Sequence, residues 1–141
     1  MLIDSLLVLM DGEDLSVGIG QVYSSNVINT STVVGDFGAG EPLYLIICVD
    51  EAFTSSGSTA TVKFSLVDSA STTIDSGSVE IVSTDTLVVT RLPLGKIIVL
   101  PVPAGLITQQ YLGVRVDIGV DTTDTGKVTA FIGTGAQTWN V

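Results

Sequence analysis

Apolar and polar residues alternate one by one through several segments of this chain. The alternation is clearest in ATVKFSL (residues 60–66), YLGVRVDI (residues 111–118) and KVTAFI (residues 127–132), and it recurs in LSVGIGQVY (residues 15–23). Successive side chains of a β-strand point to opposite faces, so this pattern predicts strands with one buried face. The side chains predicted to point inward are Leu15, Val17, Ile19, Ala60, Val62, Phe64, Leu66, Leu112, Val114, Val116, Ile118, Val128, Ala130 and Ile132.

Two further runs, Leu43–Val49 and Ile97–Leu100, are apolar on both sides and predict central strands that are covered on both faces. Turn-forming sequences such as MDGED, TSSGS, LPLG and DTTDTG separate the runs. No window keeps the 3.6-residue apolar period of a helix for three turns. The sequence therefore predicts an all-β fold over residues 1–141, a single-domain antiparallel β-sandwich of jelly-roll type with about eight to ten strands.

Both ends of the chain allow two interpretations. Residues 1–10 are apolar and form either the first strand of the sandwich or an arm that lies on a neighbouring molecule, with Leu2 and Ile3 in contact. They lack the basic region of a signal peptide and are too short to span a bilayer, so we expect synthesis in a cytoplasm. Residues 133–141 form a C-terminal tail, whose Trp139 either packs back on its own sandwich or anchors in a neighbour.

Charge and composition exclude several classes of function. The formal net charge is −10, and the five Lys and Arg residues are scattered singly. Binding nucleic acid or an anionic membrane would need clustered cations, so we expect neither as a partner. The acidity suits a basic protein partner, and 45% apolar residues suggest a surface that a partner covers.

Residue types also bear on catalysis. The chain has no histidine, which excludes a Ser-His-Asp or Cys-His arrangement, and its one cysteine, Cys48, lies in an apolar run where an inert thiol is expected. Gly38-Ala39-Gly40 precedes a strand instead of opening a helix, so it predicts a turn and not a phosphate-binding loop. The adjacent carboxylates Asp50 and Glu51 are interpreted as solvated charge. We expect no enzymatic activity and no cofactor.

One loop carries enough carboxylates to consider a metal ion. Asp121 and Asp124 lie in DTTDTG, shortly after Asp117, and oxygen ligands of this kind suit Ca²⁺. The spacing is not that of an EF-hand, and Asp and Gly are ordinary turn residues, so a plain turn explains the same sequence. These three residues are the calcium candidates.

Several blocks, taken in order, resemble a known family. DSLLVL, GAGEPLYLIICVDEAFT, LPLGKIIVLPVPAGL, YLGVRVDI and GKVTAFI, which extend from Asp4 to Ile132, are similar to the jelly-roll cement, or head-decoration, proteins of tailed bacteriophages. The closing GTGAQTWNV departs from that pattern. The resemblance implies a virion structural protein on the outer surface of the capsid, without catalysis, that binds the major capsid protein and bridges neighbouring capsomers.

The resemblance also implies self-association, as a homodimer or alternatively a trimer. Arg and Tyr on strand surfaces are frequent in interfaces, so Arg91, Tyr111 and Arg115 are candidate contact residues, although ordinary surface positions explain them equally well. The competing hypothesis is a carbohydrate-binding β-sandwich module, either free-standing or carried on a virion for host adhesion. It predicts a row of exposed aromatic rings and calcium at Asp117, Asp121 and Asp124.

Overall fold

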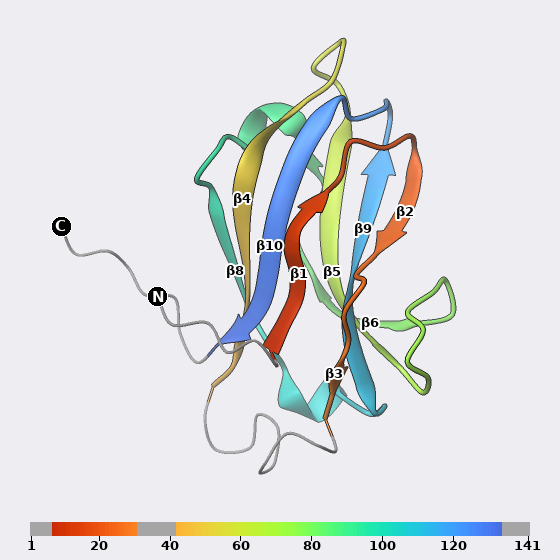
Figure 1. Ribbon diagram of the computed structural model, residues 1–141. Coiled ribbons are helices and arrows are strands. Elements are labelled where there is room, and N and C mark those ends of the chain that lie inside the picture. Colours follow the sequence, from red (N-terminus) through yellow and green to blue (C-terminus); the bar gives the residue numbers. More distant parts are fainter. Residues whose placement is uncertain (1–6, 31–41, 134–141) are drawn as a thin grey trace, which may run out of the picture.

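The computed structural model describes residues 7–30 and 42–133, which form two antiparallel β-sheets packed face to face (Figure 1). The strands are β1 (Val8–Asp14), β2 (Gly20–Tyr23), β3 (Ile28–Asn29), β4 (Tyr44–Thr54), β5 (Thr61–Ser69), β6 (Val79–Ser83), β7 (Leu87–Val88), β8 (Ile97–Pro101), β9 (Tyr111–Gly119) and β10 (Thr125–Gly133). Two short 3-10 helices, η2 (Val89–Arg91) and η3 (Ala104–Leu106), lie in the connections on either side of β8.

The strand order is that of a jelly roll. Sheet A has the order β1-β10-β4-β8, and sheet B has the order β2-β9-β5-β6, with β3 also paired to β9 and β7 to β5. The chain therefore pairs from its ends inward: β1 with β10, β2 with β9, β4 with β8, and β5 with β6. A long hairpin of this kind, rolled into two sheets, is the jelly-roll topology, and the predicted fold is confirmed.

The inner faces of the two sheets form the core. The predicted inward sides of β5, β9 and β10 are confirmed, because every member of these three sets is at most 3% exposed. From β4, Leu45 and Ile47 point into the same cluster. Phe53 and Phe64 meet edge to face with their ring centroids 6.4 Å apart, an arrangement that aromatic pairs favour.

The prediction that Ile97–Leu100 is covered on both faces was wrong. These residues belong to β8, which is the terminal strand of sheet A, and Ile97 and Val99 are 41% and 36% exposed. Pro101 ends the strand, and proline has no N–H to donate to a further neighbour. Proline within a strand is characteristic of a sheet edge, so Pro101 was the sequence signal for the observed position.

The predicted strand across residues 15–23 was also wrong in its first half. Leu15 and Val17 are held by loop contacts: the Leu15 N–H donates to the Gly126 carbonyl, and the Val17 N–H donates to Thr123 Oγ1. Ile19 is 66% exposed, and β2 begins only at Gly20. Alternation alone did not distinguish a strand from a loop in which Leu15 is buried, Val17 is half-buried and Ile19 is exposed.

The sequence MDGED, read above as a turn, is instead part of β1. The register shifts between Met10 and Glu13, where Gly12 has a positive φ of 58°, so the strand bulges there and continues to Asp14. Of residues 1–10, Val8 to Met10 therefore belong to the first strand of sheet A, whereas residues 1–6 lie outside the described part.

We predict that Gly126→Ala destabilises the fold. Gly126 has a φ of +152°, and a Cβ added there would lie 2.5 Å from the Phe53 ring in the core. Overpacking and a strained backbone should together lower the free energy of unfolding by about 2 kcal/mol or more. Urea denaturation measures the effect. Gly18→Ala is the matched control, because nothing lies within 4 Å of the added carbon, and an equal loss in both variants would contradict the prediction.

Candidate interaction surfaces

The outer face of sheet B carries a connected set of polar side chains centred on Arg115 of β9. Its Nη2 lies 3.3 Å from Glu80 Oε1, and its Nε lies 3.3 Å from Asp117 Oδ2. Lys63 Nζ reaches the same Glu80 oxygen at 3.2 Å, and Gln21 Nε2 donates to Asp117 Oδ1 at 2.8 Å. Two cations thus face two carboxylates across strands β2, β9, β5 and β6.

Neighbouring hydroxyl groups complete this network. The Ser65 hydroxyl donates to Glu80 Oε1 at 2.9 Å, and this bond, followed by Lys63, lowers the pKa of Glu80 below its usual value. The Tyr23 hydroxyl donates to Gln21 Oε1. Because the charges balance and the polar groups bind one another, this face is suited to stiffening sheet B more than to capturing a charged ligand.

The outer face of sheet A carries an apolar row that crosses all four strands. The pairing registers place Val8 beside Phe131, Phe131 beside Ile46, and Ile46 beside Val99. Ile46 is fully buried and Phe131 is 2% exposed, although neither belongs to the cluster between the sheets. We call Val8, Phe131, Ile46 and Val99 the outer apolar row.

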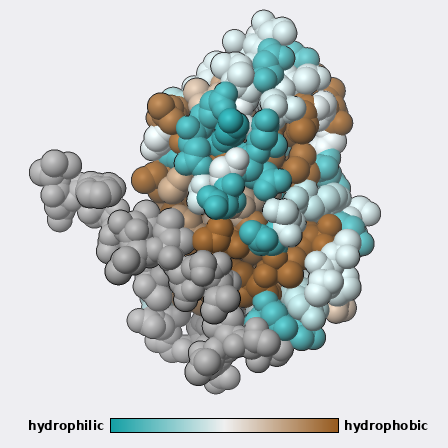
Figure 2. Space-filling model, viewed as in Figure 1, coloured by the Kyte–Doolittle hydropathy of each residue, from teal (hydrophilic) through white to brown (hydrophobic). Residues whose placement is uncertain are grey.

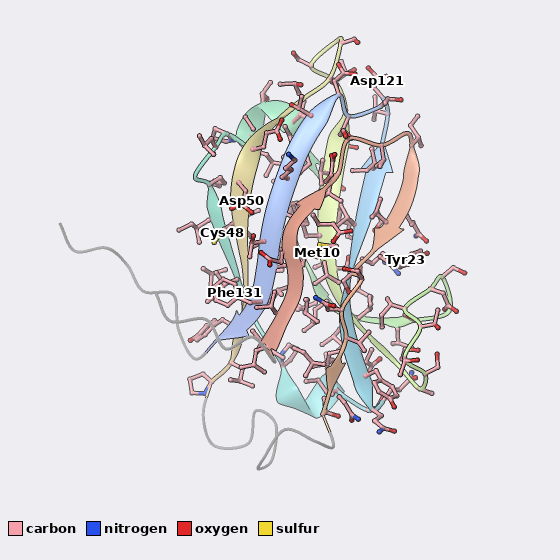
Figure 3. All side chains as sticks on the ribbon, in the orientation of Figure 1. Met10, Tyr23, Cys48, Asp50, Asp121 and Phe131 are labelled. Carbon is pink, nitrogen blue, oxygen red and sulfur yellow. The ribbon has the colours of Figure 1, made fainter. Side chains whose placement is uncertain are left out.

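This face becomes more polar along β4. Figure 3 shows Phe131, Cys48 and Asp50 in that order toward the upper end of the sheet. Thr129 of β10 donates its hydroxyl to Asp50. In Figure 2, hydrophilic side chains gather over the upper half of the visible face, and apolar surface lies below them. Cys48 is only partly buried, and desolvation followed by the nearby Asp50 raises its thiol pKa, which disfavours the reactive thiolate.

A third surface follows the free side of β8. Ile97 and Val99 are exposed there, and Leu94 in the preceding turn is 69% exposed. Arg91 and Lys96 add positive charge, and both are exposed. No Asp or Glu occurs in the sequence between Asp85 and Asp117, although the chain has fifteen acidic residues. We call Arg91, Leu94, Lys96, Ile97 and Val99 the β8 edge.

A fourth surface lies at the end of sheet B where β9 finishes. Ile19 and Val120 are 66% and 70% exposed. Both lie at the same end of the β2–β9 pair, because Gly20 pairs with Ile118, Ile19 precedes Gly20 by one residue and Val120 follows Ile118 by two. Val120 has a φ of +67°, which is a strained conformation for a β-branched residue. We call this pair the Ile19–Val120 tip.

Three carboxylates lie at the same end of the sandwich as the tip. Asp121 and Asp124 lie in the connection from β9 to β10, and Asp14 ends β1 at the same end of the sandwich; Figure 3 shows Asp121 at this upper end. Hydrogen bonds from the Ser16 hydroxyl and N–H, at 2.5 Å and 2.9 Å, lower the pKa of Asp14 and keep it charged. An end of the sandwich that carries two exposed apolar side chains and three carboxylates is suited to a partner with both apolar and basic groups.

The structure divides the predicted contact residues between different surfaces. Tyr111 and Arg115 share the outer face of sheet B, where Tyr111 is half-buried beside Asn29 and Ser69. Arg91 is exposed in η2 on the β8 edge. The remaining predicted contacts, Leu2, Ile3 and Trp139, lie outside the described residues, as does the predicted turn at Gly38-Ala39-Gly40.

The calcium candidates are held apart by separate interactions. Asp117 binds Gln21 and Arg115, Asp121 accepts a bond from the Thr122 N–H at 2.8 Å, and Asp124 accepts one from the Ser56 hydroxyl at 3.3 Å. Across residues 7–30 and 42–133, no three His, Cys, Asp or Glu side chains form a group that would hold a metal ion.

Aromatic rings in the described parts of the chain do not form an exposed row either. Phe53, Phe64 and Phe131 are buried, whereas Tyr23, Tyr44 and Tyr111 are half-buried. Among the same residues, no helix is both long and apolar enough to cross a bilayer.

One buried carboxylate, Asp68, lies at the lower end of the core. Its Oδ2 accepts hydrogen bonds from the backbone N–H groups of Thr108 and Gln109, at 3.0 Å and 3.1 Å, which ties the segment after η3 to β5. Its Oδ1 has no hydrogen-bond partner, and the residue is fully buried. Asp68 is therefore a structural acceptor for backbone groups, and the alternation in β5 gave no indication of it.

The fold and these surfaces define a jelly-roll β-sandwich protein whose polar and apolar groups are displayed on its outer faces and edges. A sequence profile of the Bbp16 family matches residues 19–132, which is about four-fifths of the chain and extends from the start of β2 almost to the end of β10. The chain belongs to the Bbp16 family, and this membership is compatible with a phage protein. A search of curated proteins found no match.

We predict that Glu80→Gln weakens the fold at neutral pH, because Glu80 receives bonds from Lys63, Ser65 and Arg115. The loss should be about 0.5–1 kcal/mol of unfolding free energy, as for other exposed ion-pair networks. Since folding lowers the pKa of Glu80, its contribution is present above the unfolded pKa and disappears as pH falls through the folded one. Urea denaturation of both proteins from pH 7 to pH 3 should therefore show converging midpoints.

Glu51→Gln is the matched control for this prediction. Glu51 makes one ion pair, with Lys127 at 3.3 Å, and both side chains are more than two-fifths exposed. We expect a smaller change at pH 7 than for Glu80→Gln. A pH-independent loss in Glu80→Gln would show that packing and not charge is responsible.

Proposed function

We propose that this protein is a non-catalytic structural protein of a phage virion, located on the outer surface of the capsid, where it binds the major capsid protein and bridges neighbouring capsomers. Membership of the Bbp16 family and the ordered resemblance to capsid cement proteins support this proposal. The single structural observation that carries it is the Ile19–Val120 tip.

The tip is the surface that we assign to the capsid. Large apolar side chains that are about two-thirds exposed indicate a surface that a partner covers. Backbone strain of the kind found at Val120 costs of the order of 1–3 kcal/mol and occurs often at functional sites. Burial of the Val120 side chain by a partner would contribute about 1.5–3 kcal/mol, which would offset the cost of this backbone strain.

Charge supports the same assignment. The three carboxylates at the same end of the sandwich and the net charge of −10 would attract a basic surface and speed docking. The rest of the molecule supplies rigidity, because its strands are hydrogen-bonded and its two inner faces are closely packed. A rigid body that contacts two capsomers must be broken or released before the seam between them opens, so it resists outward pressure from packaged DNA.

A co-sedimentation experiment tests this function. The purified protein is mixed with expanded phage capsids that lack the decoration protein, at low and at moderate salt. We expect saturable binding at a fixed ratio to capsid subunits and a higher temperature of capsid disruption. The double variant Ile19→Asp/Val120→Asp should lose most of the binding, whereas Val79→Asp, at an exposed position on β6, should keep it. No binding of the wild-type protein at low salt would refute the proposal.

A second variant separates docking from folding. Asparagine tolerates a positive φ better than valine does, so Val120→Asn should leave the free energy of unfolding unchanged or raise it. The same change removes a buried apolar contact and should weaken binding to the capsid about tenfold. Thermal denaturation and co-sedimentation measure the two effects. A variant that is both more stable and equally tightly bound would show that the strain has no part in docking.

A further inference from the structure

The backbone of β8 presents hydrogen-bonding groups on its outer side. In the described parts of the chain, β4 is the only strand that pairs with β8, which forms the left margin of sheet A in Figure 1. Just before β8 begins, the Val49 N–H donates to the Lys96 carbonyl at 2.9 Å. Alternate residues of an antiparallel strand bond to the same neighbour, so Ile97, Val99 and Pro101 direct their backbone groups away from β4.

The side chains of β8 suit a further strand on this open side. Ile97 and Val99 expose apolar side chains on the outer face of sheet A, and Ile97–Pro101 contains no charged residue. A terminal strand of this kind is a template for pairing. An extended segment of another polypeptide can bind to such an edge through main-chain hydrogen bonds, while its alternate side chains decide how well it fits.

The cations of this chain are divided between two environments. Lys63, Arg115 and Lys127 form ion pairs with carboxylates of their own sheets. Arg91 and Lys96 are exposed and form no ion pair within residues 7–30 and 42–133, although the chain has fifteen acidic residues. Both lie in the stretch from residue 86 to residue 116, which has no Asp or Glu. Their charge is therefore open to carboxylates of another molecule.

Both of these cations lie at one end of the β8 edge. Lys96 directly precedes Ile97, the first residue of the strand. Arg91 lies farther in the same direction, because the carbonyl of the next residue, Leu92, accepts a bond from the Phe53 N–H near the end of β4. The edge is thus uncharged along the strand and positive beyond its start. A strand added antiparallel to β8 would bring its C-terminal end to this positive region.

We propose that the β8 edge binds an extended acidic segment of another polypeptide by antiparallel strand addition. Alternate apolar residues of the segment lie opposite Ile97, Val99 and Pro101, on the outer face of sheet A. Their backbone groups bond to the groups that β8 directs away from β4. The Asp or Glu residues of the segment follow at its C-terminal end, where they meet Lys96 and Arg91.

This inference goes beyond the proposed function and does not depend on it. The Ile19–Val120 tip lies at an end of the sandwich that carries carboxylates, so it selects a basic partner. The β8 edge selects an acidic one, because its two cations have no carboxylate partner in the described parts of the chain. The two surfaces therefore differ in the sign of their charge, and one molecule can hold two dissimilar partners at once.

Synthetic peptides test the strand addition. The probe is a fluorescein-labelled peptide, Val-Thr-Val-Thr-Val-Asp-Glu, whose valines match the three outward residues of β8 and whose carboxylates follow them. Fluorescence anisotropy with the purified protein should show saturable binding that weakens as salt is added. The uncharged peptide that ends in Asn-Gln should bind at least about tenfold more weakly, because it lacks the charges that meet the two cations.

N-methylation separates strand addition from simple attraction of charges. In the proposed register, the N–H groups of the second and third valines point toward β8, and those of the threonines point away. Methylation of these two valine nitrogens should abolish measurable binding, whereas methylation of the two threonine nitrogens should preserve it. Equal binding of the two methylated peptides would overturn the proposal.

Variants of the protein locate the site. Lys96→Glu should weaken peptide binding more than about tenfold, because the introduced carboxylate repels those of the peptide. Lys127→Glu is the matched control: it makes the same change of charge on β10, inside sheet A, and should leave the affinity within about threefold of wild type. Circular dichroism establishes that both variants are folded. Equal losses in the two variants would overturn the assignment to the β8 edge.

Two further outcomes bear on the choice of partner. Failure of the acidic peptide to bind would overturn the inference, and equal binding of the Asn-Gln peptide would show that any apolar strand, a second copy of this chain included, fits the edge. The double variant Ile19→Asp/Val120→Asp should keep the peptide affinity while it loses the capsid. Loss of peptide binding in this variant would contradict the assignment, so a failure here is distinguished from a failure of the proposed function.

Discussion

The packing of every second side chain between two antiparallel sheets is the constraint on which the rest of this structure depends. The apolar sides of β9 and β5 both face inward in the observed register, in which Val116 lies beside Phe64. A slip of one residue would turn Arg115 and Asp117 into the core and expose the valines. Burial of each such side chain contributes about 1.5–3 kcal/mol, so the register of the central strands is strongly determined.

Every second residue of a strand points to the inner face of its sheet, so the intervening residues point outward. These outward-pointing residues differ between the two sheets. Sheet B displays a balanced network around Arg115, in which charged groups bind one another. Sheet A displays the outer apolar row, which ends at an exposed strand. The strained Val120 adds a third kind of surface at the end of the sandwich. This distribution fits a protein that acts through contacts on its outside.

The sequence was least informative where neighbouring elements, and not the alternation itself, determined exposure. Ile97–Leu100 and Leu43–Val49 look alike as apolar runs, yet β4 lies inside sheet A and β8 lies at its edge. The position of a strand within a sheet depends on the connections between strands, which no local pattern records. Only Pro101 indicated an edge. Leu15 is buried and Val17 half-buried, and their backbone N–H groups bond to Gly126 and Thr123, residues more than a hundred positions away.

The sequence by itself determined the fold class and the inner faces of the long strands, because strand geometry converts alternation directly into sidedness. It also determined the acidity of the chain and the acid-free stretch from residue 86 to residue 116. Only the tertiary structure decided which apolar side chains remain exposed, which carboxylates are separated, and that Ile19 and Val120 lie at the same end of the β2–β9 pair. Those properties arise from strands that are distant in the sequence and adjacent in space, so they exist only after the hairpin has rolled into two sheets.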